Sequence, residues 1–296
     1  MTVVVLASVK GSPGVTTAAT ALAAAWPPGR QVLLVEADPF GGDLAARYGS
    51  TVIGGLASLF AAARRTLTPD AVWAHVQPLP GGLPVLFGLT GVRQAMANEN
   101  AWPPVAQALA GLDADVVVDA GRLLPGFAGG VGAVLEVADV LVVLSGATLE
   151  SVVHLRDALP GVLAQMGGRR LLVVPTGSDG YPAADIARTL EVTVGPALPD
   201  DPAAAAALGN RRGVKRLERT RLLRWAAALV AELGVDAVPV IAPSDTNTDA
   251  VRGELPPGVA FDEPLPSIDE LIDRPPELSS PERSPVGAGS KWEARP

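Results

Sequence analysis

The chain contains no cysteine, only two histidines and only 4% aromatic residues among its 296 residues. Without cysteine there can be no disulfide, no thiolate metal site and no cysteine nucleophile. His75 and His154 are too few to favour a histidine-rich metal site or a Ser-His-Asp triad, and we interpret each as an ordinary surface or packing residue. A core with few aromatics must be built from Ala, Val and Leu, which favours closely packed helices on a sheet of β-branched strands.

Long hydrophobic runs are also missing. No apolar stretch reaches the roughly 18 residues that a membrane-spanning helix needs. Residues 2–7 are apolar, but they are too few for a signal peptide and no basic segment precedes them. We therefore expect a cytoplasmic protein without a transmembrane segment.

The net charge of −8 is unevenly distributed. Residues 236–296 hold 12 acidic and 5 basic residues, whereas the rest holds 19 and 18. The same C-terminal stretch is rich in proline and lacks hydrophobic periodicity. These features predict a folded domain over residues 1–235 and an acidic, largely disordered tail over 236–296.

One segment of the tail, "SIDELID" at 267–273, has a helical pattern. Ser267 and Glu270 have the spacing of a capping box, and the apolar residues Ile268, Leu271 and Ile272 fall on one helical face. Two interpretations stay open. The apolar residues are a chance grouping, or the segment is a short helix that folds into the groove of a protein partner.

Continuous apolar runs recur along residues 1–235 and alternate with helical patterns. The runs are "TVVVLAS" (2–8), "QVLLVEA" (31–37), "LPVLFGL" (83–89), "ADVVVDA" (114–120), "DVLVVLS" (139–145) and "RRLLVVPT" (169–176). Helical patterns occupy about 16–25, 149–166, 182–190 and 214–234. Because apolar runs without alternation are typical of strands buried on both faces, the pattern predicts a doubly wound α/β fold. We expect a mostly parallel sheet of about seven strands flanked by helices.

The loop "ASVKGSPGVTT" at 7–17 joins the first strand to the first helix. Such a loop presents backbone N–H groups and a helix N-terminus, an arrangement that favours an anion. The strict phosphate-loop pattern G-x-x-x-x-G-K-[ST] is not met, because Val9 and Val15 replace its first glycine and its lysine. Alone, the loop does not distinguish an altered nucleotide site from a chance run of small residues.

Four segments taken together resemble the ParA/MinD family of partitioning and positioning ATPases. "KGSPGVTT" is similar to the family's deviant Walker A motif K-G-G-x-G-K-[ST]-T, with Lys10 at the signature lysine. "LLVEADPFGGD" is similar to the D-x-D-P segment after the second strand, and "ADVVVDAG" to Walker B. "LLVVPTG" and "VGPALPDDPAAAAALGNRRG" occupy the places of the segments that surround the adenine. The resemblance covers about residues 1–235 in the expected order, and the atypical loop also resembles the TadZ/CpaE-like relatives of pilus assembly.

The resemblance implies a site for ATP or ADP with Mg²⁺. Asp38 would orient the attacking water, and Lys10 would reach the nucleotide of the facing subunit in a homodimer. Thr16, Asp38 and Asp119 would hold the metal. The residues implied in nucleotide binding are Lys10, Gly11, Ser12, Gly14, Val15, Thr16, Thr17, Thr176, Pro199 and Asp200. Without the resemblance, Lys10 is a solvated loop lysine, Asp38 the start of a turn before Pro39, and Asp119 a strand-end cap.

The departures from the family pattern cluster at the nucleotide. Val15 replaces the lysine that would contact the β- and γ-phosphates, and each charge-assisted hydrogen bond lost costs roughly 1.5–3 kcal/mol, or about ten- to a hundred-fold in affinity. Ser12 replaces a glycine, Pro13 offers no N–H, and Thr176 stands where an adenine-reading Asn is expected. We expect weakened ATP binding and slow or absent hydrolysis.

A basic cluster precedes the last helical pattern. It holds one acid, Glu218, and the cations Arg211, Arg212, Lys215, Arg216, Arg219, Arg221 and Arg224. Leu222, Ala226 and Leu229 share a helical face that should pack on the core. The cluster is either a solvated basic face, a sequence-neutral contact to DNA through Arg212, Lys215, Arg216 and Arg219, or a contact to an anionic membrane.

Three functions therefore stay open. The first is a ParA/MinD-like ATPase whose nucleotide-gated dimer positions chromosomes, plasmids, the septum or polar machinery. The second is a non-hydrolysing pseudo-ATPase scaffold, as in pilus or secretion assembly. The third is a relative without nucleotide that binds partners through the basic cluster and the acidic tail. Val15 and Thr176 favour the second and third, whereas Lys10, Asp38 and Asp119 favour the first and second.

Overall fold

The computed structural model describes residues 1–10, 14–123, 130–177, 180–209 and 216–235. The chain divides into a first unit, Met1–Ala242, and a second, Pro243–Pro296, and all described residues belong to the first. The predicted tail over 236–296 lies outside the described residues, together with Ile268, Leu271 and Ile272. The domain boundary after residue 235 therefore stays a prediction.

Parallel strands form the centre of the fold. Within the described residues there is one eight-stranded sheet in the order β3-β4-β2-β5-β1-β6-β7-β8, and its members are β1 (Val3–Ser8), β2 (Val32–Glu36), β3 (Gln77–Pro78), β4 (Pro84–Leu86), β5 (Asp115–Arg122), β6 (Val140–Gly146), β7 (Arg170–Thr176) and β8 (Thr193–Val194). β3 runs antiparallel to β4, and the other pairings are parallel. The predicted mostly parallel, doubly wound sheet is confirmed, with one strand more than the seven expected. β3 and β8 are two-residue edge strands without an apolar run.

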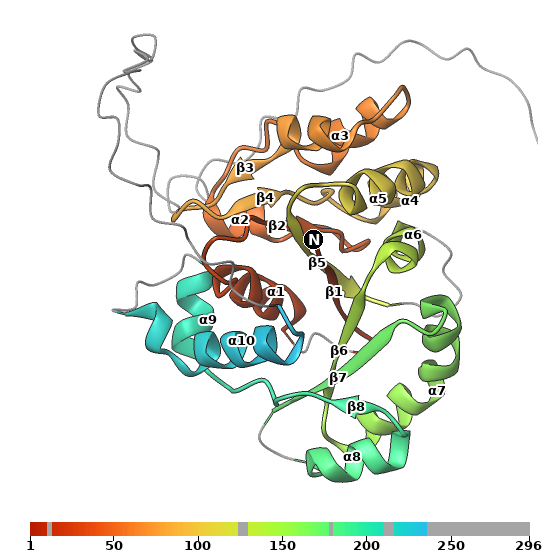
Figure 1. Ribbon diagram of the computed structural model, residues 1–296, viewed down its shortest axis with the longest axis vertical. Helices are drawn as coiled ribbons and strands as arrows, with labels where there is room; N and C mark the ends of the chain where they lie inside the picture. The colour runs from red at the N-terminus through yellow and green to blue at the C-terminus, as the bar shows by residue number, and fades with distance from the viewer. Residues whose placement is uncertain (11–13, 124–129, 178–179, 210–215, 236–296) are drawn as a thin grey trace, which may run out of the picture. The chain divides into compact units, whose positions relative to one another are not determined.

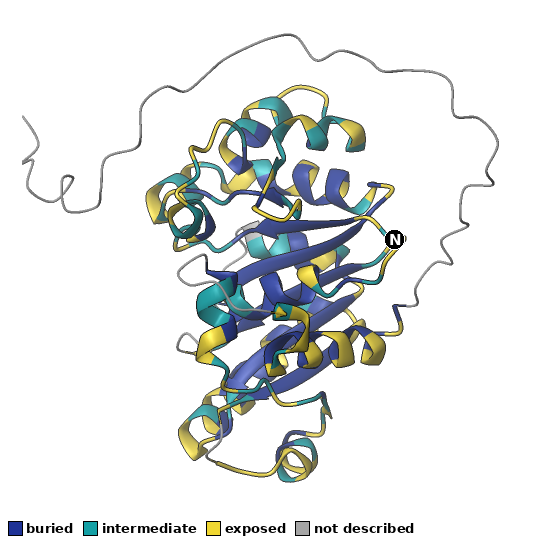
Figure 2. Ribbon diagram, turned by 90° about the vertical axis from the view of Figure 1, so that its left-hand side faces the viewer, coloured by how far each residue is buried: buried dark blue, intermediate teal, exposed yellow. Residues whose placement is uncertain are grey.

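Helices cover both faces of the sheet, which explains why the strands are apolar along their whole length (Figures 1 and 2). Every residue of β1 and β2 is buried. A strand in contact with water on one face would alternate apolar and polar residues, and a strand covered on both faces has no such need. The continuous runs seen in the sequence thus follow from the layering.

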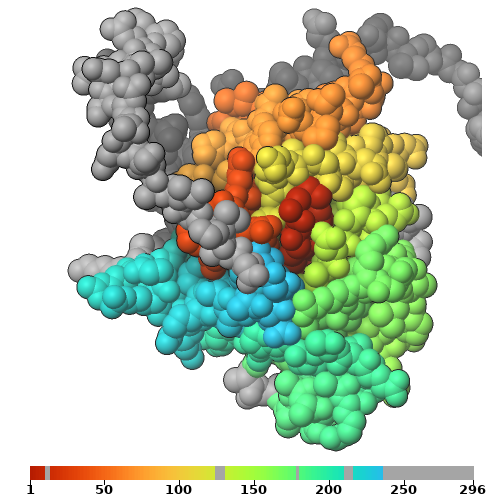
Figure 3. Space-filling view, viewed as in Figure 1, coloured from red at the N-terminus to blue at the C-terminus, as the bar shows by residue number. Residues whose placement is uncertain are grey.

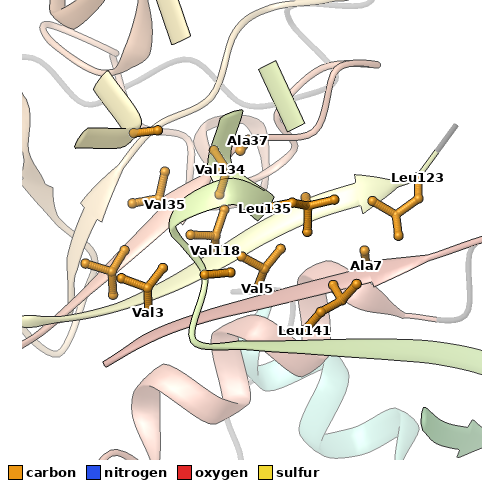
Figure 4. Packing of buried hydrophobic residues seen from close by; sticks show 14 of the residues in the cluster. Val3, Val5, Ala7, Val35, Ala37, Val118, Leu123, Val134, Leu135 and Leu141 are labelled. Atoms are coloured by element: carbon orange, nitrogen blue, oxygen red, sulfur yellow. The ribbon is translucent and has the colours of Figure 1, made fainter. Parts of the chain in front are cut away.

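The helices of one face pack with the sheet in one hydrophobic cluster. They are α3 (Leu56–Ala63), α5 (Trp102–Ala110), α6 (Gly130–Val137), α7 (Leu149–Met166) and α8 (Ala183–Leu190), with the 3₁₀ helix η1 (Pro69–His75). Figure 4 shows Val5, Val118 and Leu135 gathered between the sheet and α6. The short helices α4 (Val92–Ala97) and η2 (Glu99–Ala101) precede α5.

The second face is covered by α1 (Val15–Ala24), α2 (Leu44–Tyr48), α9 (Pro202–Leu208) and α10 (Arg221–Glu232), which share a separate cluster with the sheet. The alanines of α1, among them Ala18, Ala19 and Ala21, are fully buried and let this helix lie close to the strands. Leu222, Ala226 and Leu229 of α10 are buried as well, so the predicted core face of that helix is confirmed.

The helix predicted over 214–234 is shorter in the structure, whereas those over 149–166 and 182–190 match α7 and α8. A 3₁₀ turn, η3 (Leu217–Arg219), comes first, and α10 begins only after Thr220. Thr220 has extended backbone and its hydroxyl accepts a hydrogen bond from the Leu223 amide, which makes it an N-cap. In the described part of the chain, no helix has the length and apolar character that crossing a membrane requires.

Candidate functional site

The candidate site lies where the carboxyl ends of the central strands meet the first helix. From β1 the chain continues through α1 to β2 on one side, and from β5 it continues through α6 to β6 on the other side of β1. Such a reversal of direction leaves a crevice at the strand ends, the usual ligand site of open α/β sheets. A cavity of about 410 Å³ occupies this place, and its lining consists of Ser8, Gly14, Val15, Thr16, Thr17, Asp38, Phe40, Asp43, Arg47, Gly121 and Arg122.

The N-terminus of α1 forms one wall of this cavity. Gly14 is the N-cap in left-handed conformation, with φ of 91°, and it provides no side chain to cap the first turn. Thr16 and Thr17 follow and line the cavity. Amides of an uncapped first turn, with the helix dipole behind them, favour an anion. Gly11 and Ser12 lie outside the described residues.

Val15 both lines the cavity and belongs to the core. Its side chain is only 6% exposed and joins the cluster of α1 with the sheet. An apolar residue there offers a phosphate no charge and no hydrogen bond. Val15, which stands where the resemblance places a lysine, therefore packs in the core and carries no charge.

Asp119, near the end of β5, is the most unusual group of the site. Its carboxyl is fully buried; Oδ1 accepts a hydrogen bond from the Gly121 amide at 3.1 Å, and Oδ2 has no partner among the described residues. Burial raises the pKa of Asp119 to about 7, and the charges of Glu36 and Asp38 add to this shift. The Thr16 hydroxyl and the Gly121 amide oppose it. In the part of the chain that the structure describes, no group of three or more acidic or histidine side chains is arranged to hold a metal ion, and Asp119 Oδ2 is a single buried oxygen without a hydrogen-bond partner there.

Asp38 lies close to Asp119 because the ends of β2 and β5 remain paired: the Ala37 amide donates to the Asp119 carbonyl at 2.7 Å. Its Oδ1 accepts from the Phe40 amide at 2.7 Å, so Asp38 does form the turn that its place before Pro39 predicts. It also lines the cavity. Burial raises the pKa of Asp38, an effect that the Phe40 amide opposes.

Gly121 allows this close approach. Its φ is 58°, and a Cβ built on it would lie 2.1 Å from Cγ of Asp38. Any side chain at this position would have a backbone conformation that favours glycine and would also displace the Asp38 carboxyl. The glycine therefore brings the Asp38 carboxyl against the backbone that follows Asp119.

Glu36, at the end of β2, has a structural role. It is buried, and its carboxylate accepts hydrogen bonds from the amides of Asp43, Leu44 and Gly88 at 2.5, 2.8 and 3.0 Å. Burial raises the pKa of Glu36, and the three amides oppose the shift. These bonds hold the loop after Asp38 and the start of α2 against the sheet.

Lys10 lies at the edge of the site and contacts its own chain. Its exposed Nζ is 2.6 Å from Nε2 of His154, on α7. Since a lysine ammonium has only donors, the imidazole nitrogen is the acceptor. His154, expected to be an ordinary surface residue, thus contacts a candidate site residue, whereas His75 pairs with the Ser58 hydroxyl at 2.6 Å away from the cavity.

The predicted base-side residues do not line this cavity. Thr176 ends β7 and forms a parallel bridge with Leu198, and the Leu198 amide donates to the Pro175 carbonyl at 2.8 Å. Pro199 and Asp200 follow directly. This loop nevertheless passes close to α1, because Leu198 Cδ2 is 3.8 Å from a Cβ built on Gly14.

The described part of the basic cluster is exposed. Arg216 caps η3 with φ of 57°, and Arg219, Arg221 and Arg224 are exposed on η3 and α10. Figure 3 shows α9 and α10 as one continuous area of surface, in cyan and blue. Arg211, Arg212 and Lys215 lie outside the described residues.

Sequence reasoning missed Arg47 and Arg122, both of which line the cavity. It also missed a second, more apolar cavity of about 260 Å³ beside α4, α5 and α6, which shares Asp38, Phe40 and Arg122 with the first. The sequence did contain a signal for Arg122, because Gly121 and Arg122 directly follow the apolar run that ends at Ala120.

The geometry defines a doubly wound α/β fold with a mostly parallel sheet. No family model and no curated protein matches the chain. Solved structures do: a ParA family ATPase from Chlorobium tepidum (19% identity, 77% of this chain and 98% of that one, TM-score 0.62), the cell division ATPase MinD from Pyrococcus furiosus (18%, 79% and 98%, 0.63) and McdA from Cyanothece in complex with ATP (18%, 80% and 98%, 0.60). The chain therefore has the ParA/MinD fold.

Proposed function

We propose that this chain binds ATP or ADP with Mg²⁺ in the cavity at the ends of β1 and β5, and that it acts in spatial positioning or partitioning of cellular machinery. The observation that carries the proposal is the buried Asp119 carboxyl, whose Oδ2 is left unpartnered among the described residues next to the first turn of α1. The similarity to ParA, MinD and McdA structures supports the cellular role.

Thr16, Asp38 and Asp119 have the chemistry to hold Mg²⁺, which prefers oxygen ligands and retains several waters. The unpartnered oxygen of Asp119 and the cavity-lining carboxylate of Asp38 both fit this ion. When bound, Mg²⁺ neutralises charge on the phosphates. The amides at the start of α1 and the hydroxyls of Thr16 and Thr17 would hold the phosphate oxygens, and Asp38 would orient a water.

Binding is expected to be weak and hydrolysis slow. Val15 offers no charge where the resemblance places a lysine, and Asp38 already accepts a hydrogen bond from the Phe40 amide. Phosphoryl transfer depends on positioning and on neutralised charge at the γ-phosphate, so both deficits reduce the rate more than the affinity. A turnover at the rate of ordinary family members that Asp38→Ala abolishes would contradict this.

A homodimer and a contact to DNA are further parts of the proposal. Lys10 is exposed, so it is free to leave His154 for the nucleotide of a second copy. Arg216 and Arg219 are exposed beside α10 and favour sequence-neutral contact to phosphates. Salt-dependent binding to duplex DNA is the measurement that tests the second contact.

Thermal unfolding of the full chain with millimolar ATP, with and without Mg²⁺, tests the nucleotide site. Binding to the folded state raises the melting temperature by mass action. We expect stabilisation that requires Mg²⁺ and is lost in Asp119→Asn. The matched control is Asp113→Asn, an exposed acid before β5, which should keep the full shift. No Mg²⁺-dependent shift in the unaltered chain would overturn the proposal.

The second candidate is a pseudo-ATPase scaffold of the TadZ/CpaE-like type. The observation in its favour is the second cavity, whose lining includes the exposed apolar residues Phe40, Val92 and Met96, the last of them 61% exposed. Exposed apolar side chains around a cavity are typical of protein contacts. A chain that ATP does not stabilise would favour this candidate.

A further inference from the structure

Arg122 is held at the entrance of the phosphate loop by the pairing of β5 with β1. It lies opposite Ser8 in the register of the two strands, after a shift between Leu6 and Ser8. The next amide, of Leu123, donates to the Ser8 carbonyl at 2.7 Å. The end of β5 thus stays attached to the last residue of β1, two positions before Lys10.

The guanidinium of Arg122 has one backbone anchor. Its Nε donates to the carbonyl of Val9 at 3.2 Å, and the structure gives its two terminal nitrogens no partner among the described residues. The side chain is exposed and lines the cavity. A guanidinium held through Nε keeps two parallel N–H groups for a phosphate.

The other arginine of the cavity is engaged elsewhere. Arg47, on α2, donates to Asp43 at 2.7 Å one helical turn earlier. Its charge is therefore paired with that of Asp43, the residue that precedes α2. Arg122 has no ion-pair partner in the part of the chain that the structure describes.

The remaining charges around the cavity favour a cation near the phosphates. Asp43 is paired with Arg47, which leaves Asp38 as the unpaired acid of the described lining, and Val15 contributes no charge. A triphosphate entering this site meets the charge of Asp38, which has its own sign. Mg²⁺ offsets part of the repulsion, and a further cation within reach of the phosphates favours binding.

We propose that Arg122, from the end of β5, supplies the phosphate-binding cation that Val15 cannot supply from α1. The inference rests on the proposed nucleotide function. It assigns the phosphate-binding charge to β5 in place of α1. The register of β5 with β1 and the hydrogen bond to Val9 fix the position of Arg122.

The test measures the affinity of the full chain for ATP with Mg²⁺ by calorimetry. Arg122→Gln should weaken binding by about 10- to 100-fold, since it removes a charge-assisted pair of bonds. Arg122→Lys keeps the charge but loses the pair of parallel N–H donors. Its affinity should therefore lie between those of Arg122→Gln and the unaltered chain. Arg64→Gln, remote from the cavity at the end of α3, is the matched control and should bind as the unaltered chain does.

A second experiment tests whether the side chains at positions 15 and 122 contact the same phosphates. Val15→Lys combined with Arg122→Gln should recover most of the lost affinity, with circular dichroism confirming that the variants fold. Unchanged affinity in Arg122→Gln, or an equal loss in Arg47→Gln, would overturn the assignment to Arg122 and leave the proposed function intact. If the unaltered chain does not bind ATP with Mg²⁺, both proposals fail.

Discussion

Asp115 begins β5 and Asp119 lies four residues further along the same strand, and both are buried. Every hydrogen-bonding need of Asp115 is met: Arg30 donates to both of its oxygens at 2.6 Å, and the Trp26 indole and the Thr2 amide donate at 2.8 and 2.7 Å. Among the residues that the structure describes, Asp119 accepts from one amide at 3.1 Å, and its other oxygen has no partner. One strand thus carries a satisfied acid and an unsatisfied one.

The pKa values of the two acids move in opposite directions. Burial tends to raise the pKa of Asp115, but the hydrogen bonds from Arg30 and Trp26 and the Arg30 charge outweigh it and lower the pKa. At Asp119 burial prevails and raises the pKa to about 7. Burial alone therefore does not fix the direction in which the pKa of a buried acid moves; the hydrogen-bond partners and neighbouring charges decide it.

Asp115→Ala should give the largest effect on stability. It removes the acceptor of the Arg30 and Trp26 hydrogen bonds within the fold, and breaking such a buried pair costs about 3–5 kcal/mol. Urea unfolding measures the loss. Asp113→Ala, two residues earlier and exposed, should change stability by about 0.5 kcal/mol or less. Equal effects of the two substitutions would remove the structural role of Asp115.

Gly121→Ala should have the next largest effect, about 2–4 kcal/mol, from left-handed backbone and from the Cβ that would lie 2.1 Å from Cγ of Asp38. Gly49→Ala separates the two causes. Gly49 has a nearly identical φ of 59°, and no atom of the described residues lies within 4 Å of its Cβ position, so only about 1–2 kcal/mol is expected there. Equal losses in urea unfolding would mean that Asp38 moves aside freely.

Asp119→Asn should change how stability depends on pH. The folded pKa of about 7 lies above the ordinary value of 3.8, so in the unliganded chain the contribution of Asp119 is favourable at low pH and is lost as pH rises through 7. The variant lacks this loss and should gain about 2–3 kcal/mol relative to the unaltered chain between pH 5 and pH 8. Urea unfolding at both values, without Mg²⁺ or nucleotide, measures it. Parallel pH profiles would refute the raised pKa.

Much of the fold was predictable because periodicity reports burial. The runs at 2–8, 31–37, 114–120, 139–145 and 169–176 correspond to strands of four or more residues. β3 and β8 were not predictable, since two-residue edge strands have no pattern of their own. The break at Thr220 was missed because an apolar helical pattern continued beyond it, although threonine is a good N-cap.

The candidate site was partly predictable for a different reason. Gly14, Val15, Thr16, Thr17 and Asp38 stand in segments that resemble known motifs, and they line one cavity in the structure, with Asp119 buried behind them. Thr176, Pro199 and Asp200 matched by order along the chain and do not line it. Arg122 belongs to no motif, and only the pairing of β5 with β1 places it opposite Ser8 at the cavity.

By itself, the sequence determined the layered α/β architecture and the chain of small residues between the first strand and the first helix, because apolar period and turn chemistry are local properties. The tertiary structure alone decided how many described partners each of the two acids on β5 has, and which arginine is hydrogen-bonded to Val9 after β1. Hydrogen-bond satisfaction and charge balance depend on groups more than a hundred residues apart, such as Arg122 and Val9, and no local pattern encodes such a distance.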